Sequence, residues 1–187
     1  MGVHGVKPEF VRGLASSGYR LASADDLVSF AIHGVDLEYI RGMAAAGPRL
    51  QHLPAKDLVS LRIHGVKPAY VQQMAAIGPA FRNLTADDLV AFGIHGVQPA
   101  LVQAFARVNR NPLHPDAVVA MAIHGVTPEF IIALASLGYG DLNADDLVKL
   151  RIHGVSASYV QSLARAGMPH LTAEQLVRLR LAGFDGR

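Results

Sequence analysis

Two short amphipathic patterns alternate along the chain, and both are clearest in the fifth of its similar segments. Phe130, Ile131 and Leu134 form one apolar stripe at helical spacing. Thr127 is an N-cap residue type immediately before this stripe, and Gly138 supplies the left-handed residue that commonly ends a helix. The first pattern therefore predicts a short helix between Thr127 and Gly138.

The second pattern predicts another short helix, which starts after an N-cap residue and an acidic first turn. In the same segment Asn143 is the cap, and two aspartates follow it. Leu147 and Leu150 are expected to be buried, together with the closing Ile152. The corresponding caps in other segments are Ser23, Thr85, Thr172 and, followed by a proline, His114.

The tripeptide His-Gly-Val joins one pair of helices to the next. Its six copies begin 29 or 31 residues apart, and a degenerate copy occupies residues 181–184. The glycine is expected to end one helix, and the valine to pack at the start of the next. A period near 30 residues is typical of helical repeat proteins.

These patterns predict an all-α fold of helix-turn-helix repeats of 29–31 residues, stacked into an α-solenoid or superhelix. Helices of about ten residues are too short to be stable alone, so each depends on its neighbours. We expect a single repeat array over residues 1–187, with a terminal half-unit over 182–187. The repeat units are 4–32, 33–63, 64–94, 95–123, 124–152 and 153–181.

The residue after each first helix is expected to adopt a left-handed conformation. It is glycine in five repeats and asparagine in one, and asparagine tolerates this conformation better than most residues. These residues are Gly18, Gly47, Gly78, Asn109, Gly138 and Gly167.

The histidines of the joints are assigned a structural role. Packed helices lie about 8–10 Å apart, whereas zinc ligands converge to about 2 Å from the metal, so no metal site is expected. A neutral imidazole can accept a hydrogen bond from the start of the following helix. Alternatively, a protonated imidazole complements the end of the preceding helix. The joint histidines are His4, His33, His64, His95, His124 and His153.

One polar position recurs on the first helices and forms a candidate ladder for binding a partner. Long polar side chains at intervals of one repeat suit the backbone of an extended peptide, although they equally fit a plain solvent-facing surface. The ladder is interrupted by Ile132 and consists of Arg12, Arg41, Gln72, Gln103 and Gln161. A second row, Arg62, Arg151 and Arg180, is sparser and is interrupted by small residues.

The composition of the chain argues against several classes of function. The chain is 51% apolar but has no uninterrupted apolar run of the length that a membrane-spanning helix needs. A net charge of +2 is low for a strong polyanion binder. Without cysteine or the motifs HExxH, GxSxG and GxxxxGK, the sequence predicts neither an enzyme nor a cofactor.

The joint is similar to the hairpin of helix-hairpin-helix DNA-binding modules, which reads Gly-apolar-Gly followed by Pro or Ser. The stretch from Gly65 to Pro68 matches the first glycine, the apolar residue and the proline. The second glycine, which lets backbone N–H groups approach a phosphate, is absent from every copy. Nucleic-acid binding therefore stays open as an alternative, although it is disfavoured.

The whole unit resembles a bacterial tandem repeat. The resemblance rests on His-Gly-Val-Thr-Pro-Glu-Phe-Ile at 124–131 and Ala-Asp-Asp-Leu-Val at 144–148. Similar repeats occur in the C-terminal parts of beta-lactam-sensor-type regulatory membrane metallopeptidases and related envelope proteins. The resemblance implies an accessory recognition or spacer segment at the bacterial envelope, without the peptidase itself.

The sequence therefore predicts a non-catalytic scaffold that binds a protein or peptide. A structural spacer without a specific ligand is the main alternative. No insertion of this segment into a membrane is expected.

Overall fold

A computed structural model describes residues 8–16, 19 and 23–185 of the chain. Every regular element in these residues is helical, so the fold is all-α as predicted. The chain divides into two compact units, residues 1–94 and 95–187. This division coincides with the predicted border between the third and fourth repeats.

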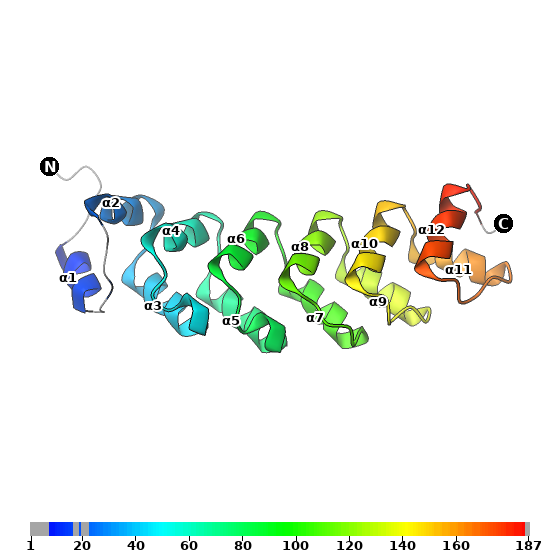
Figure 1. Ribbon diagram of the computed structural model, residues 1–187, viewed down its shortest axis with the longest axis horizontal. Coiled ribbons are helices and arrows are strands. Elements are labelled where there is room, and N and C mark those ends of the chain that lie inside the picture. Colours follow the sequence, from blue (N-terminus) through cyan, green and yellow to red (C-terminus); the bar gives the residue numbers. More distant parts are fainter. Residues whose placement is uncertain (1–7, 17–18, 20–22, 186–187) are drawn as a thin grey trace. The chain divides into compact units, whose positions relative to one another are not determined.

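The first unit contains six α-helices and two short 3-10 turns in its described residues (Figure 1). The elements are α1 (Pro8–Ser16), α2 (Ala24–His33), α3 (Leu37–Ala46), η1 (Pro48–Leu50), α4 (Ala55–Ile63), α5 (Pro68–Ile77), η2 (Pro79–Phe81) and α6 (Ala86–Ile94).

The second unit has six α-helices, each of nine or ten residues. They are α7 (Pro99–Val108), α8 (Pro115–Ile123), α9 (Pro128–Ser136), α10 (Ala144–Ile152), α11 (Ala157–Arg165) and α12 (Ala173–Leu181).

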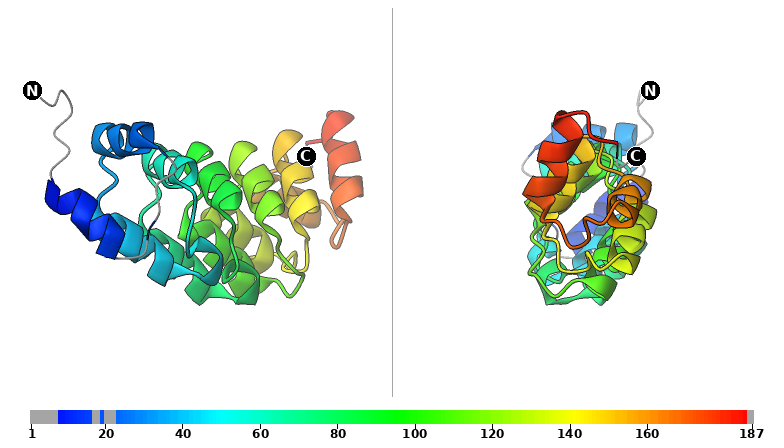
Figure 2. Two further views of the ribbon diagram at one scale, coloured as in Figure 1. Left: turned by 60° about the vertical axis from the view of Figure 1, so that its left-hand side comes forward. Right: turned by 90° about the vertical axis from the view of Figure 1, so that its right-hand side faces the viewer.

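Inside each unit the helices form two layers, because each helix packs against the helix two places further along the chain. In the first unit α1, α3 and α5 make one layer and α2, α4 and α6 the other. In the second unit α7, α9 and α11 lie together, as do α8, α10 and α12. Both layers can be followed within each unit in Figure 2.

The core of each unit lies between its two layers. Both layers supply side chains that are completely inaccessible to solvent. In the first unit these include Phe30, Met43, Leu61, Met74 and Leu89, and in the second Met121, Leu134, Leu150, Leu163 and Leu176. Burial of these side chains provides the stability that helices of this length lack on their own.

The joints at Gly65, Gly125 and Gly154 end the preceding helix in a Schellman motif. At the second described joint His64 is the C-cap residue. The N–H of Gly65 donates to the carbonyl of Arg62 at 3.1 Å, and the N–H of Val66 donates to Leu61 at 2.9 Å. The predicted role of the glycine is confirmed at all described joints, since φ lies between 62° and 73° at Gly34, Gly65, Gly96, Gly125, Gly154 and Gly183.

The valine of each joint is the apolar residue that completes this motif. All five described joint valines are buried, with at most 4% of the side chain exposed: Val35, Val66, Val97, Val126 and Val155. The tripeptide thus closes one helix through its backbone and anchors the next through an apolar side chain.

The predicted N-caps of the second helices are confirmed where the cap is Ser, Thr or Asn. Ser23 accepts a hydrogen bond from the N–H of Asp26, and Asn143 accepts one from Asp146. Thr85 and Thr172 cap their helices in the same way. His114 occupies the N-cap position of α8, but its side chain makes no capping hydrogen bond.

The left-handed residue predicted after each first helix is confirmed in two repeats and wrong in three. Gly138 and Gly167 have φ of 93° and 86°. Gly47, Gly78 and Asn109 instead have φ of −168°, 177° and −125°. Gly18 lies outside the described residues.

A following proline explains the extended backbone at Gly47 and Gly78. At Asn109 the extended backbone is accompanied by a side-chain hydrogen bond. Pro48 and Pro79 follow the two glycines, and a residue before proline is driven to extended backbone. The extra residues of the two longer repeats then form η1 and η2. Asn109 is buried, and its amide donates to the carbonyl of Leu142, in the loop between α9 and α10.

We expect the joint glycines to be necessary for stability because of their positive φ, and not because a side chain would lack space. At Gly65 a methyl group would meet no atom within 4 Å, yet φ is +72°. We expect Gly65→Ala to lower the free energy of unfolding by about 1–2 kcal/mol in urea denaturation.

Gly78→Ala is the matched control for this substitution. Its surroundings are equally open, but its backbone is extended, so we expect a change within about 0.5 kcal/mol. Equal losses for the two variants would contradict the role of the left-handed conformation.

Candidate interaction surfaces

The predicted polar ladder is exposed along its whole length. Arg12, Arg41 and Gln72 project from α1, α3 and α5 in the first unit, and Gln103 and Gln161 from α7 and α11 in the second. Ile132, which interrupts the ladder on α9, is 45% exposed. The ladder residues are therefore free to meet a partner, and each unit presents its own part of the ladder.

The joint histidines occupy the C-cap region of the second helices, and His4 lies outside the described residues. His64, His124 and His153 are C-cap residues with φ near −90°. None of the five described imidazoles makes a hydrogen bond.

The N–H groups at the start of the following helices have other acceptors in three joints. Asp36, Thr127 and Ser156 accept them through their side chains. The hypothesis of a neutral imidazole acceptor thus has no support at these joints. The alternative role, at the end of the preceding helix, agrees with the C-cap position and stays a prediction.

The closing residue of each second helix is exposed, which corrects the expectation that it is buried. The exposed fractions lie between 54% and 68% for Ile32, Ile63, Ile94, Ile123, Ile152 and Leu181. Helical geometry gives the reason: at about 100° per residue, a residue two positions after a core residue points almost directly away from it. Ile152 is placed in this way relative to the buried Leu150.

The sparse arginine row connects the second helix of a repeat to the first helix of the same repeat, a role that the sequence reading missed. The guanidinium of Arg62 lies 4.9 Å from the centre of the Tyr39 ring, and that of Arg151 lies 5.3 Å from the Phe130 ring. Nε of Arg151 also donates to the carbonyl of Gly125 at 2.7 Å. The detectable signal was the presence, in each repeat that has the arginine, of an aromatic residue on the first helix of that repeat.

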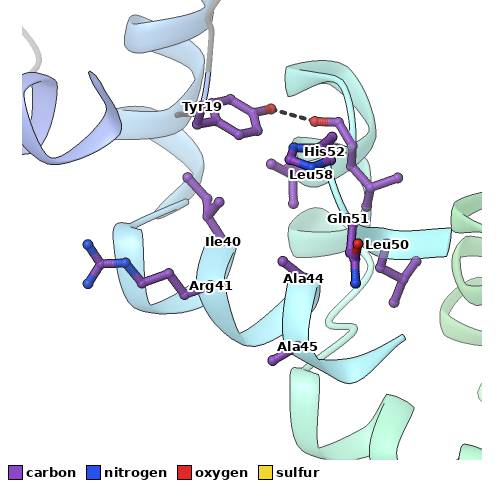
Figure 3. Close-up of a pocket in the computed structure, with 10 residues that line it drawn as sticks. Tyr19, Ile40, Arg41, Ala44, Ala45, Leu50, Gln51, His52 and Leu58 are labelled. Carbon is purple, nitrogen blue, oxygen red and sulfur yellow. Dashed lines mark hydrogen bonds between the residues drawn. The ribbon is translucent and has the colours of Figure 1, made fainter. Parts of the chain in front are cut away.

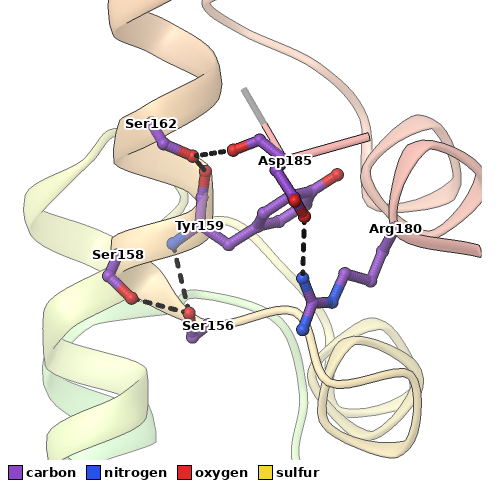
Figure 4. A network of polar contacts seen from close by, with 6 residues as sticks. All are labelled: Ser156, Ser158, Tyr159, Ser162, Arg180 and Asp185. Atoms are coloured by element: carbon purple, nitrogen blue, oxygen red, sulfur yellow. Dashed lines mark hydrogen bonds and ion pairs between the residues drawn. The ribbon is translucent and has the colours of Figure 1, made fainter. Parts of the chain in front are cut away.

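The third arginine belongs to a larger polar network at the end of the second unit (Figure 4). Arg180 lies over the Tyr159 ring at 5.1 Å and pairs with Asp185 at 3.9 Å. The Ser162 hydroxyl is within hydrogen-bond distance of the carbonyl oxygens of Tyr159 and Asp185. The Tyr159 hydroxyl is buried without a hydrogen-bond partner, and burial raises its pKa, while Arg180 lowers it in part.

Two other tyrosines, the buried Tyr39 and the half-buried Tyr19, connect repeats through their hydroxyl groups. The Tyr39 hydroxyl donates to the carbonyl of Val66 at 2.9 Å, and that of Tyr19 donates to Leu53 at 2.6 Å. Burial raises the pKa of both phenols to about 12, although Arg62 acts in the opposite direction on Tyr39. These contacts are structural, since each hydroxyl is already engaged.

A pocket of about 400 Å³ lies beside the ladder in the first unit (Figure 3). Ile40, Leu50 and Leu58 form its apolar part, and Arg41 and His52 add polar groups. His52 has a φ of 59°, unusual for a residue other than glycine. The pocket therefore places an apolar hollow next to one residue of the ladder.

The described residues contain no group of three or more His, Asp or Glu side chains arranged to hold a metal ion. No single described helix is long and apolar enough to cross a membrane. Consecutive helices reach that length only as bent pairs, such as α8 and α9, whose axes bend by 96° at their break.

No family model matches the chain, and neither a curated protein nor a solved structure matches it significantly.

The arginine contacts are expected to stabilise the second unit. Arg151→Ala removes both the hydrogen bond to Gly125 and the contact with Phe130. We expect it to lower the free energy of unfolding by about 1–2 kcal/mol. Arg178→Ala is the control, because its ion pair with Glu174 is a solvent-exposed one, and we expect a change within about 0.5 kcal/mol. Similar effects of the two variants in urea denaturation would contradict a specific role for Arg151.

From the raised pKa values of the tyrosines we predict how the stability of the protein changes at alkaline pH. A phenol whose pKa is raised in the folded state stabilises the fold below its unfolded value of 10.0. That contribution is lost as pH rises through the folded value of about 12. We therefore expect stability to fall between these two pH values, and tyrosinate absorbance of the folded chain to appear well above pH 10.

Tyr39→Phe is the variant that connects this pH dependence to one residue. It should reduce the alkaline loss of stability and lower stability at neutral pH by about 1 kcal/mol, because the bond to Val66 is gone. A folded chain whose tyrosines all titrate near pH 10 would show this interpretation to be wrong.

Proposed function

We propose that this chain is a non-catalytic scaffold for binding a protein or peptide, and that its helix pairs stack as an α-solenoid. The same two-layer packing in both units supports the stacking. Repeat arrays of this kind bind through one residue per repeat along a shared surface. The proposal includes no cofactor and no metal.

The observation that carries the proposal is the exposed aliphatic residue at the same place in every repeat. Isolated exposed apolar residues are common on protein surfaces and need no explanation. Here, however, the same position is exposed in every repeat. An isoleucine or leucine that is more than half exposed lies at the C-terminal end of each of the six second helices, α2, α4, α6, α8, α10 and α12. A polar residue there would be better solvated, so its regular absence favours a surface used for contact.

The polar ladder is the second surface in the proposal. It lies on the first helices, whereas the aliphatic residues lie at the ends of the second helices, so substitutions can separate the two. Arg12 and Arg41 make the ladder of the first unit cationic, while Gln103 and Gln161 leave that of the second unit neutral.

Nucleic-acid binding is the weaker alternative. A phosphate-binding hairpin offers free backbone N–H groups, but those of Gly65 and Val66 donate to carbonyl groups of α4. The corresponding groups of Gly125 and Val126 donate to carbonyl groups of α8. The resemblance to bacterial envelope repeats adds a spacer function as the other alternative and suggests an envelope location.

Selection from a displayed library of random peptides tests the proposal on the intact chain. We expect one family of related peptides to be enriched on the folded chain. Enrichment should be lost when either the ladder or the set of exposed aliphatic residues is substituted. The ladder variant carries Ala at Arg12, Arg41, Gln72, Gln103 and Gln161, and the other variant carries Gln at Ile32, Ile63, Ile94, Ile123, Ile152 and Leu181.

Circular dichroism should show that both variants keep the helical content of the parent chain, because all the substituted side chains are exposed. No enrichment on the intact chain would favour the spacer alternative. Tight retention of duplex DNA that weakens steeply with salt would favour the nucleic-acid alternative.

A further inference from the structure

The exposed aliphatic residues of the second unit form a row at adjoining helix ends. Packing of α10 against both α8 and α12 brings Ile123, Ile152 and Leu181 into neighbouring positions. The contact of Arg151 with the Gly125 carbonyl shows that the C-terminal ends of α8 and α10 adjoin. Nε of Arg180 likewise lies near Gly154, at the end of α10: it is 3.9 Å from the position that a Cβ atom would occupy at Gly154. We call these three aliphatic residues the second-unit row.

Positive charge accompanies this row and distinguishes it from its counterpart in the first unit. Lys149 and Arg178 precede Ile152 and Leu181 by three residues, a spacing that places two side chains on the same helix face. Both cations are exposed, and Lys149 makes no ion pair among the described residues. Arg178 pairs with Glu174, and Asp185 pairs with Arg180. Asp145 and Asp146 lie one helical turn before Lys149, in the first turn of α10.

The first unit offers the same geometry without the two cations at this spacing. Ile32, Ile63 and Ile94 are as exposed as their counterparts, at 55–56%. The residues three positions earlier are Ser29, Ser60 and Ala91. The charge of the second-unit row is therefore not a requirement of the fold, which makes it a candidate for selecting a partner.

The spacing of the row fits one conformation of a bound chain. Packed helices lie about 8–10 Å apart, so the side chains of the row recur at about that interval. A polyproline II helix has three residues per turn and rises about 3.1 Å per residue, so every third residue returns to the same face after about 9 Å. One side chain of such a segment can therefore meet each helix end in turn.

We propose that the second-unit row binds an extended acidic segment with an aliphatic residue at every third position. The aliphatic side chains cover Ile123, Ile152 and Leu181, and the carboxylates between them face Lys149 and Arg178. This inference rests on the proposed scaffold function and specifies the chemistry of its partner.

Fluorescence anisotropy of a labelled peptide, three copies of Leu-Pro-Glu, titrated with the full-length chain tests the proposal. We expect saturable binding that weakens with salt, because charge contributes to it. Ile152→Gln should weaken binding about five- to tenfold, because the aliphatic contact is lost. Lys149→Glu should weaken it by a similar factor, and a peptide with Lys in place of Glu should not bind.

Ile63→Gln is the matched control, because Ile63 has the same place in its repeat, the same exposure and the same preceding arginine as Ile152, but Ser60 in place of Lys149. It should leave binding of the peptide unchanged. Urea denaturation of each variant shows whether it is folded at the temperature of the binding measurement.

Three results would overturn the inference. They are no saturable binding of the acidic peptide, equal losses for Ile63→Gln and Ile152→Gln, or binding of phosphatidylserine vesicles without binding of the peptide. If the displayed library still yields peptides that depend on the ladder, the scaffold function stands and only this partner chemistry fails. If neither experiment yields a peptide, both proposals fail.

Discussion

The left-handed glycine of each joint is the constraint on which the structure depends. Nine or ten residues of helix do not persist alone in water, so each helix has to end sharply and return its apolar face to a neighbour. The Schellman motif does this with backbone hydrogen bonds from the glycine and the residue after it, as at Gly65 and Val66. It requires a positive φ, which glycine adopts without the steric cost of a side chain.

Each second helix is held against the start of its own repeat in more than one way. Arg62 and Arg151 bridge to aromatic rings on the first helix of the same repeat. At the equivalent position α6 has Gly93, where a methyl group would lie 2.6 Å from the carbonyl oxygen of His64. A close approach of backbones therefore replaces the arginine in that repeat, which explains why the arginine row is interrupted while the helix packing continues.

The joint also determines which apolar side chain each repeat exposes. Once the glycine ends the second helix, the preceding isoleucine projects into solvent and the following valine is buried, as for Ile63 and Val66. Each repeat thus exposes one aliphatic side chain. The residue three positions before it is charged in some repeats and neutral in others, as Lys149 before Ile152 and Ser60 before Ile63 show. A scaffold of this kind can keep its packing constant while its units differ in what they bind.

The sequence by itself determined the helices, their caps and the joints, because these depend on interactions among residues close together in the chain. The bonds from the N–H of Asp26 to the Ser23 hydroxyl and from Val66 to Leu61 are of this local kind. Local chemistry also explains the corrections at Gly47 and Gly78, since the proline after each was visible in the sequence. The exposure of the polar ladder likewise follows from its position on amphipathic helices.

Only the tertiary structure decided which distant side chains meet. The contact of Arg151 with Phe130 and the bond from Tyr39 to Val66 join residues more than twenty positions apart. The exposure of Ile152, by contrast, follows from helical geometry, because Ile152 lies two positions after the buried Leu150. Periodicity indicates which face of a helix is apolar, but the packing of neighbouring helices determines how much of that face is covered.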